Sequence, residues 1–381
     1  KKIISMKIYY WCPYLTNIAT IKSVLRSAKS LLTYNKSKNI SEVSILNSSG
    51  EWDFQKKNSI NIKIQNLYPF SFHKFLPKEG LIQSRLSFLI ILLVNFFPLI
   101  FKIKKEKPNY LIVHLLTFLP IILSPLLSKN TKIILRISGL PEFTLLRTIT
   151  WKLFSRYIYK VTAPTEKTLK LLKKTKIFNK NQIFLLRDPA IDKNEIIINK
   201  KKHILKKLKK KKFILSIGRL TGQKNFEFLI KMFAKYKKII NVDYLIIIGE
   251  GEKRHKLQKI IKNFNCERSI NLIGFKNNVY NYINRCEALI STAEYEDPGF
   301  TLLEAAFLKK KIISSLVDNG PREMRRHGNL CYFFNLNNEK SFLTAIIKSK
   351  SKNYKKIKDA QKYSEKFLIL AHYKNFKKIL T

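Results

Sequence analysis

Glu296-Asp297-Pro298-Gly299-Phe300-Thr301-Leu302-Leu303-Glu304 decides how the rest of the chain is interpreted. The apolar run 288–292 before it predicts a buried strand, and the run 302–308 within and after it predicts a helix. Asp-Pro-Gly is typical of a turn, so the order is strand, turn, helix. The amide groups at such a helix start favour an anion such as phosphate. Two carboxylates bracket this turn, and we expect the second, Glu304, on the helix's first turn.

A second stretch has the same order of elements. Residues 213–218 predict a buried strand, residues 219–225 a turn, and residues 226–236 a helix. The turn carries Arg219 and Lys224, two cations beside a helix start. Cations placed there can bind a diphosphate from a direction that the backbone amides do not cover.

Five pieces of sequence follow one another in a fixed order: Gly218-Arg219, Lys224-Asn225, Ile248 to Gly251, Leu272 to Phe275, and the pair Glu296 and Glu304. As a set spanning about residues 211–325, they resemble the donor-binding half of the retaining GT-B glycosyltransferases of family 4, also called glycosyl transferases group 1, which include sucrose synthase. The first half resembles the acceptor domain of these enzymes. The resemblance implies an α/β GT-B fold, with two Rossmann-like doubly wound parallel-sheet domains facing a cleft.

The composition limits the alternatives without choosing between them. The chain of 381 residues has 74 basic and 25 acidic residues, a net charge of +49. Such a charge suits nucleic acid, an anionic membrane or acidic substrates, or it reflects lysines spread over solvated faces. The four cysteines are far apart without zinc-type spacing, which favours reduced thiols. Residues 3–10 predict a strand and not a secretory signal.

The first half begins as a doubly wound sheet. Residues 6–11 predict a strand, 19–33 a helix and 43–46 the next strand. The loop between the first strand and the helix lies where ligands of such sheets bind. Many relatives carry two glycines in this loop, whereas this chain has Asn17 to Thr20. Asn17 and Thr20 are our candidates for the acceptor or sugar side.

Residues 86–101 are the most apolar segment, with Arg85 before them and lysines after them. The segment is shorter than the roughly 20 residues that span a bilayer. A buried helix and an interfacial helix on anionic lipid both remain open.

Two further candidates lie on strands of the first half. His114 ends the predicted strand 110–114 and is expected to face the cleft, and Arg136 lies in the strand 132–137. Relatives use a histidine against the donor sugar, although a histidine at a strand end is as often structural. Residues 151–159 predict an amphipathic helix, and Thr165 the N-cap of another.

The lysine-rich residues 193–212 mark a boundary. We expect an acceptor-binding domain at 1–192, a nucleotide-sugar-binding domain at 193–362, and a helix at 363–381 that returns to the first domain, as the resemblance implies.

The resemblance also assigns roles. Glu296, Arg219 and Lys224 form the catalytic set, Glu296 contacting the transferred sugar and the two cations the departing diphosphate. Glu304 accepts hydrogen bonds from the ribose, and Gly274-Phe275 lie alongside the nucleotide base. The donor-binding set is Arg219, Lys224, Gly274, Phe275, Gly299, Phe300, Thr301, Leu302 and Glu304. The resemblance implies no metal and no cofactor, with a UDP-, GDP- or ADP-sugar as substrate.

The first hypothesis is therefore a retaining, metal-independent hexosyltransferase that uses a nucleotide-diphosphate sugar and a lipid-linked glycan acceptor in cell-surface polysaccharide or lipopolysaccharide synthesis. Its place is the cytoplasm, peripheral on the inner face of the cell membrane. A GT-B protein that binds nucleotide sugars without transfer is an alternative. A nucleic-acid-binding protein is another, but no reading module such as a zinc finger is present in the sequence, so no specific nucleic acid is expected.

Overall fold

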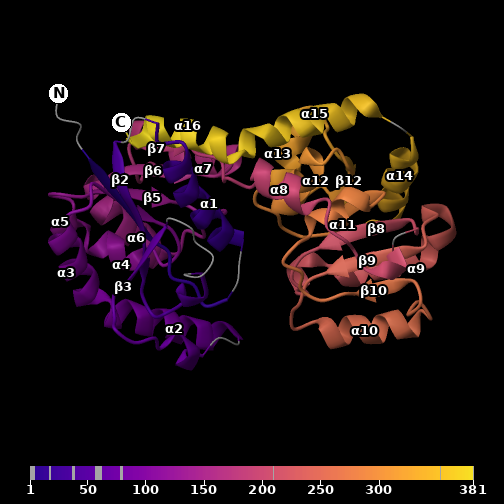
Figure 1. The fold of residues 1–381 in the computed structure, drawn as a ribbon, viewed down its shortest axis with the longest axis horizontal. Coiled ribbons are helices and arrows are strands. Elements are labelled where there is room, and N and C mark those ends of the chain that lie inside the picture. Colours follow the sequence, from indigo (N-terminus) through magenta and orange to yellow (C-terminus); the bar gives the residue numbers. More distant parts are fainter. Residues whose placement is uncertain are drawn as a thin grey trace. The chain divides into compact units, whose positions relative to one another are not determined.

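The computed structural model describes residues 5–16, 19–36, 39–55, 62–77, 80–208, 210–351 and 353–380 (Figure 1). The chain forms two compact units. The N-terminal unit contains residues 1–189 together with 369–381, and the second unit contains residues 190–368. The last helix of the chain therefore belongs to the N-terminal unit.

The N-terminal unit is built on a seven-stranded parallel sheet with the order β3-β2-β1-β4-β5-β6-β7. Its strands are β1 (Met6–Trp11), β2 (Ile40–Asn47), β3 (Lys63–Asn66), β4 (Tyr110–Val113), β5 (Lys132–Arg136), β6 (Ile158–Ala163) and β7 (Ile183–Leu185). Its helices are α1 (Ala19–Thr33), α2 (Gly80–Val94), α3 (Phe96–Glu106), α4 (Phe118–Ile122), α5 (Ser124–Leu127), α6 (Leu145–Phe154), α7 (Glu166–Thr175) and α16 (Ile369–Leu380).

The central strands are apolar throughout because both faces of this sheet are covered. In β1, Tyr9 and Trp11 pack into one core cluster, with α3, α4 and α6. Ile8 and Tyr10 point to the other face and pack into a second cluster, with α1 and α16. Because side chains alternate along a strand, β1 contributes side chains to two separate cores.

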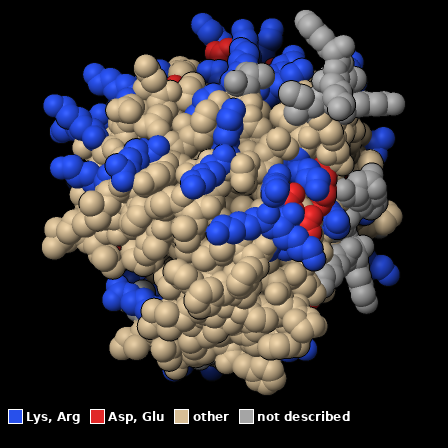
Figure 2. All heavy atoms as spheres, turned by 90° about the vertical axis from the view of Figure 1, so that its left-hand side faces the viewer, with Lys and Arg blue, Asp and Glu red and all other residues tan. Residues whose placement is uncertain are grey.

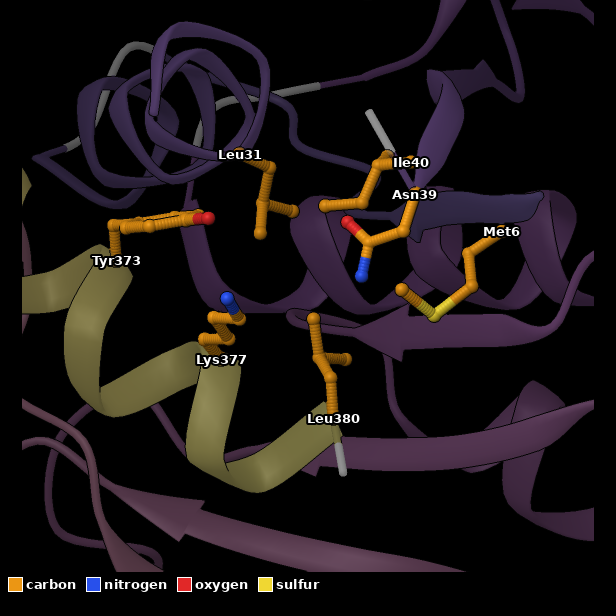
Figure 3. A pocket seen from close by; sticks show the side chains of 7 residues that line it. All are labelled: Met6, Leu31, Asn39, Ile40, Tyr373, Lys377 and Leu380. Carbon is orange, nitrogen blue, oxygen red and sulfur yellow. The ribbon is translucent and has the colours of Figure 1, made fainter. Parts of the chain in front are cut away.

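Helix α16 completes the second of these cores. Phe376, Ile379 and Leu380 are buried against α1 and the neighbouring strands. The contact leaves a hollow of only about 50 Å³. Figure 3 shows its lining residues, namely Met6, Leu31, Asn39, Ile40, Tyr373, Lys377 and Leu380. A space of this size suits one or two water molecules and not an organic ligand.

The second unit has a six-stranded parallel sheet with the order β10-β9-β8-β11-β12-β13. Its strands are β8 (Phe213–Ile217), β9 (Tyr244–Ile248), β10 (Ile270–Leu272), β11 (Ala288–Ser291), β12 (Lys311–Ser315) and β13 (Tyr332–Phe334). Its helices are α8 (Lys193–Asn199), α9 (Phe226–Ile240), α10 (Arg254–Asn263), α11 (Tyr280–Arg285), α12 (Phe300–Phe307), α13 (Gly320–Arg326), α14 (Glu339–Lys350) and α15 (Tyr354–Ser364). Both units are doubly wound, as predicted.

Each sheet reverses its strand order once. The reversal lies between β1 and β4 in the N-terminal unit and between β8 and β11 in the second unit. Ligands of doubly wound sheets bind beyond the carboxyl ends of the strands at such a reversal. The segments after β8 and β11 are the two turns that the sequence singled out.

Residues 86–101 do not form one helix. Helices α2 and α3 meet at Asn95 with a bend of 48°. The buried Asn95 side chain donates to the carbonyl of Ile91, which also accepts from the Asn95 backbone amide. The bend falls here because Pro98 has no amide for the carbonyl of Val94, four residues earlier. No single helix among the described residues is long and apolar enough to cross a membrane, and by length and composition alone this bent pair could.

The predicted helix 151–159 is also wrong in its limits. Thr144 accepts a hydrogen bond from the amide of Arg147, so α6 begins at Leu145. The helix ends at Phe154, and Ile158 already belongs to β6. Thr165 caps α7, as predicted. The four cysteines are buried and form no disulfide.

Candidate active site

The two turns beyond β8 and β11 are joined by a buried ion pair. The ammonium of Lys224 lies 2.6 Å from a carboxylate oxygen of Glu296. Their side chains are only 18% and 9% exposed. Because β8 and β11 are neighbouring parallel strands, residues 72 positions apart meet at one edge of the sheet. The predicted pair of catalytic side chains is therefore brought together.

Backbone contacts fix the same two turns. The Gln223 amide donates to the carbonyl of Tyr295 at 2.9 Å, and the amide of Glu294 donates to the carbonyl of Gln223 at 2.8 Å. The hydroxyl of Thr292 donates to the carbonyl of Lys224 at 3.0 Å. These bonds hold the Lys224–Glu296 pair on a rigid frame, as a binding site requires.

Helix α12 begins two residues earlier than predicted. Gly299 has a φ of +88°, a left-handed conformation that favours glycine, and the helix starts at Phe300. No side chain caps this end. The amides of Phe300, Thr301 and Leu302 therefore have no acceptor within the helix and are available to an anion. The earlier start puts Glu304 on the second turn, which corrects our expectation.

Glu304 is buried, with 3% of its surface exposed. The hydroxyl of Tyr280 lies 3.2 Å from a Glu304 carboxylate oxygen and 3.3 Å from one of Glu195. Tyr280, at the start of α11, is itself buried. The carboxylate of Glu304 is thus held in position by a residue from another helix.

The Asp297-Pro298 peptide bond, which is cis, lies against the segment before α13. The Asn319 amide donates to a carboxylate oxygen of Asp297 at 2.6 Å, and the amide of Gly320 donates to the carbonyl of Glu296 at 3.1 Å. The turn between the two carboxylates is therefore supported by the start of α13, a contact without a signal in the sequence.

Arg219 differs from Lys224 in its surroundings. Its side chain is exposed, and it has no hydrogen-bonding or ionic partner within the described ranges. The Lys224 side chain instead passes over Gly218, where a methyl group would lie 3.0 Å from its methylenes. A free cation and a paired cation thus flank the same turn.

Gly274 and Phe275 follow β10, at the same edge of the sheet. Gly249 donates its amide to the carbonyl of Gly274 at 3.1 Å, which links the ends of β9 and β10. Phe275 is 66% exposed. Since β10 lies two strands from β8, these residues are about 10 Å from the cationic turn at the usual strand spacing.

In the N-terminal unit, His114 and Arg136 are neighbours at the carboxyl ends of β4 and β5. Val113 pairs with Leu135 and Arg136 with Thr162, so His114, Arg136 and Thr162 form a row across three strands. All three are buried, and each has polar side-chain atoms without a partner among the described residues. His114 was expected at an open edge and is instead fully enclosed, since Tyr10 stacks on its ring.

Arg136, within this row, forms an ion pair and also affects the protonation of His114. Arg136 donates to a carboxylate oxygen of Asp188 at 2.5 Å, and Ser23 donates to the same atom at 2.8 Å. Burial, and next the nearby charge of Arg136, hold the pKa of His114 well below its usual range, so this imidazole is neutral. Thr20 is half-buried in the first turn of α1. Asn17 lies outside the described residues.

Comparison with known proteins adds an independent observation. Residues 197–367 match the family Glycosyl transferases group 1. The chain carries a group 1 glycosyl transferase domain. The whole chain also has the predicted GT-B fold, since it superposes on Anabaena HepE in complex with UDP and glucose with a TM-score of 0.68 over 98% of both chains, at 11% identity.

Two curated relatives match part of this chain. An N-acetylgalactosamine-N,N'-diacetylbacillosaminyl-diphospho-undecaprenol 4-alpha-N-acetylgalactosaminyltransferase of Campylobacter jejuni is 31% identical over 137 residues, covering 36% of this chain and 37% of that protein. An uncharacterized glycosyltransferase of Methanocaldococcus jannaschii is 27% identical over 208 residues, covering 52% and 51%. The matches thus span about half or less of the length of these relatives.

Three residues of the candidate site had no signal in the sequence: Tyr280, Gln223 and Asn319. Each acts on a residue at least 22 positions away, Tyr280 on Glu304, Gln223 on the segment 294–295 and Asn319 on Asp297. Nothing local marks a tyrosine or an amide for such a contact. For Gln223 and Asn319, a signal could have come only from the order of the strands, which places the segments after β8, β11 and β12 side by side.

Proposed function

We propose that the protein is a retaining glycosyltransferase that moves a hexose-type sugar from a nucleotide-diphosphate sugar to a lipid-linked glycan acceptor in cell-surface polysaccharide or lipopolysaccharide synthesis. The observation that carries this proposal is the meeting of Lys224, Glu296 and the uncapped start of α12 at the strand reversal of the second sheet. Cations, free amides and a carboxylate at one edge suit a diphosphate joined to a sugar.

The diphosphate is proposed to lie between Arg219, Lys224 and the first amides of α12. Arg219 has no partner among the residues described, so its five donors are available to phosphate oxygens. About 10 Å separates this turn from Gly274 and Phe275. A ribose between the base and the diphosphate bridges a distance of this order, which supports a base site at Gly274–Phe275 and a ribose site at Glu304.

The proposed reaction needs no additional reactant. The bond from C1 of the donor sugar to the diphosphate oxygen breaks, and the electron pair leaves with the diphosphate. The acceptor oxygen bonds to C1 on the same face, and its proton passes to the departing phosphate oxygen. Lys224 and Arg219 stabilise the charge that develops there, which accelerates the step because they are already in place. Glu296 orients the sugar and stabilises positive charge on its ring.

Acceptor binding is assigned to the carboxyl edge of the N-terminal sheet. Thr20, His114 and Arg136 lie on segments at or near the strand reversal of this sheet, and of the three Thr20 is half-buried while His114 and Arg136 are enclosed. The Campylobacter relative is named for a diphospho-undecaprenol acceptor, which supports a lipid-linked acceptor here. Peripheral contact with the inner face of the membrane follows from such an acceptor. HepE binds UDP and glucose, which favours a UDP-sugar among the candidate donors.

The test is donor binding and transfer by purified protein. A panel of UDP-, GDP- and ADP-sugars is screened by thermal shift, because a ligand that binds the folded state raises its melting temperature. The donor that shifts most is then offered with lipid-linked acceptors. We expect Arg219→Ala with Lys224→Ala to abolish transfer, whereas Lys231→Ala, an exposed lysine on α9, leaves it unchanged.

Three results contradict the proposal in different ways. Transfer that survives the double substitution overturns the site. Donor binding without transfer to any acceptor favours the binder without activity. Inversion of the anomeric centre in the product overturns the retaining mechanism alone.

A further inference from the structure

A second site lies in the N-terminal unit, between the end of α3 and α5. A hollow of about 330 Å³ is lined there by Ile103, Lys104, Lys107, Pro125, Leu126, Leu127, Lys129, Asn130 and Thr131. Its volume is within the range of small-ligand sites. None of these residues has a role in the proposed sugar transfer.

The walls of the hollow are held together by hydrogen bonds. The Thr131 hydroxyl donates to the carbonyl of Pro108 at 2.8 Å, and the amide of Lys132 donates to the carbonyl of Asn109 at 2.9 Å. Ile103 and Leu127, on opposite sides, are both buried in the same core cluster. The hollow is therefore preformed.

Three ammonium groups surround this hollow. Lys104, Lys107 and Lys129 are exposed, and none has an ionic partner within the part of the chain that the structure describes. Glu106, the acid on α3, pairs with Lys102 at 3.3 Å instead. Three cations around one space repel one another, so an anion that enters it is favoured.

Apolar side chains lie directly beside these lysines. On α3, Phe97 and Phe101 are 64% and 69% exposed, and Lys104 follows on the same face at helical spacing. Leu126, which lines the hollow, is half exposed. The same apolar stripe runs along α2, through Ile82, Leu86, Leu89 and Leu93, which are all at least half exposed. Large exposed apolar patches mark interaction surfaces.

Figure 2 shows the side of the molecule that is on the left in Figure 1, where α3 and α5 lie. Lys and Arg side chains far outnumber acidic ones on this face, and they stand around a broad uncharged area. The combination suits a surface that has both negative charge and hydrocarbon.

The hollow is distinct from the candidate active site. Lys107 precedes β4 and Lys129 precedes β5, so the hollow is at the amino ends of these strands. His114 and Arg136 lie at their carboxyl ends. The two sites are thus at opposite edges of one sheet, and a ligand in the hollow does not occupy the acceptor position.

We propose that this hollow binds the phosphate headgroup of an anionic phospholipid, while Phe97, Phe101 and Leu126 enter the adjoining acyl region of the bilayer. A free phosphate would satisfy the lysines but would leave the apolar side chains in water, which is why a lipid is the favoured occupant. The proposal rests on the membrane contact proposed above but not on sugar transfer.

Flotation with vesicles tests the proposal on the full chain. Vesicles of phosphatidylcholine with phosphatidylglycerol are compared with phosphatidylcholine alone, at physiological ionic strength. At about 1 kcal/mol per lysine near an anionic surface, Lys104→Gln, Lys107→Gln and Lys129→Gln together should weaken binding about a hundredfold. Phe97→Ser with Phe101→Ser should weaken it at least tenfold, because two apolar side chains no longer enter the bilayer.

A matched triple variant distinguishes the effect of this site on vesicle binding from the effect of the protein's overall charge. Lys170, Lys173 and Lys174 are exposed on α7, in the same unit. Their replacement by glutamine removes the same charge and should change binding less than threefold. An equal loss in both triple variants overturns the site, as does no loss in the first. A phenylalanine variant that binds like the wild type overturns the entry of these side chains into the bilayer, and with it the reason for preferring a lipid to a free phosphate.

Donor binding keeps this test independent of the proposed function. All variants should retain the thermal shift with the nucleotide sugar, since none touches the second unit. Failure of vesicle binding alone therefore contradicts the lipid site, whereas failure of the thermal shift in the wild type contradicts the glycosyltransferase.

Discussion

His372 on α16 should make the N-terminal unit unstable at mildly acidic pH. Its Nδ1 lies 2.8 Å from the carbonyl of Arg187, which only accepts, so Nδ1 carries the proton. Its Nε2 then accepts from the Ser27 hydroxyl at 2.8 Å, and Tyr10 donates to Ser27 at 2.9 Å. The neutral imidazole thus satisfies every member of this buried chain, and protonation would add a buried charge.

Burial, together with the nearby charge of Arg136, lowers the pKa of His372 from 6.5 to about 3. The unfolded chain binds this proton near pH 6.5 and the folded chain does not, so the stabilisation is complete above pH 6.5. It falls as the pH drops from 6.5 toward 3, by about 1.4 kcal/mol per pH unit. Between pH 6.5 and pH 5 this histidine alone should remove about 2 kcal/mol from the free energy of unfolding.

Tryptophan fluorescence measures this unit selectively. All three tryptophans, Trp11, Trp52 and Trp151, are buried in the N-terminal unit, and the second unit has none. Urea unfolding followed by fluorescence at several pH values between 7 and 5 therefore gives the free energy of unfolding of this unit.

The matched variant is His372→Gln, whose amide can replace both hydrogen bonds but cannot titrate. Burial also lowers the pKa of His114, so the wild-type curve contains a second contribution of the same sign. The difference between wild type and variant isolates His372, and it should shrink by about 2 kcal/mol on going from pH 6.5 to pH 5. Parallel curves for the two proteins would refute the assignment of a neutral buried imidazole.

Four other substitutions test separate parts of the structure. Phe376→Ala should destabilise the N-terminal unit by about 3–5 kcal/mol in the same fluorescence assay, because this fully buried ring leaves a cavity. Gly249→Ala should destabilise the second unit by at least about 1–3 kcal/mol in urea followed by circular dichroism, since φ is +148° and a methyl group would lie 1.8 Å from the Gly218 carbonyl oxygen. Arg219→Ala should weaken donor binding about tenfold to a hundredfold in calorimetry without loss of stability, because the side chain is exposed. Tyr280→Phe should weaken donor binding about fivefold or more, since it removes a hydrogen bond that positions the carboxylate of Glu304; equal affinity would contradict this positioning role.

The order of the elements was determined by the sequence. The apolar strand 213–217 and the turn with Arg219 and Lys224 are found where the residues predict them, as is the strand before Glu296. These signals are local: an apolar run without alternation indicates a strand buried on both faces, and glycine, proline and aspartate end it. The doubly wound class follows from the same alternation of strands and helices.

Element limits were less predictable where a single side chain decides them. Asn95, whose side chain donates to the carbonyl of Ile91, lies at the junction of the two helices in the apolar segment, and Thr144 sets the start of α6. Both residue types also occur within helices or loops without such an effect. Only the packing around them determines which hydrogen bond their side chains make.

The tertiary structure alone decided which side chains meet. Lys224 and Glu296 are 72 positions apart, and they pair because β8 and β11 are neighbours in the sheet. The burial of His114 and the hydrogen bond from Tyr280 to Glu304 likewise depend on residues from other elements. Contacts between distant segments have no local signal, since their free energy arises only when the sheet forms. The sequence thus determined the parts of the site, and the fold determined their partners.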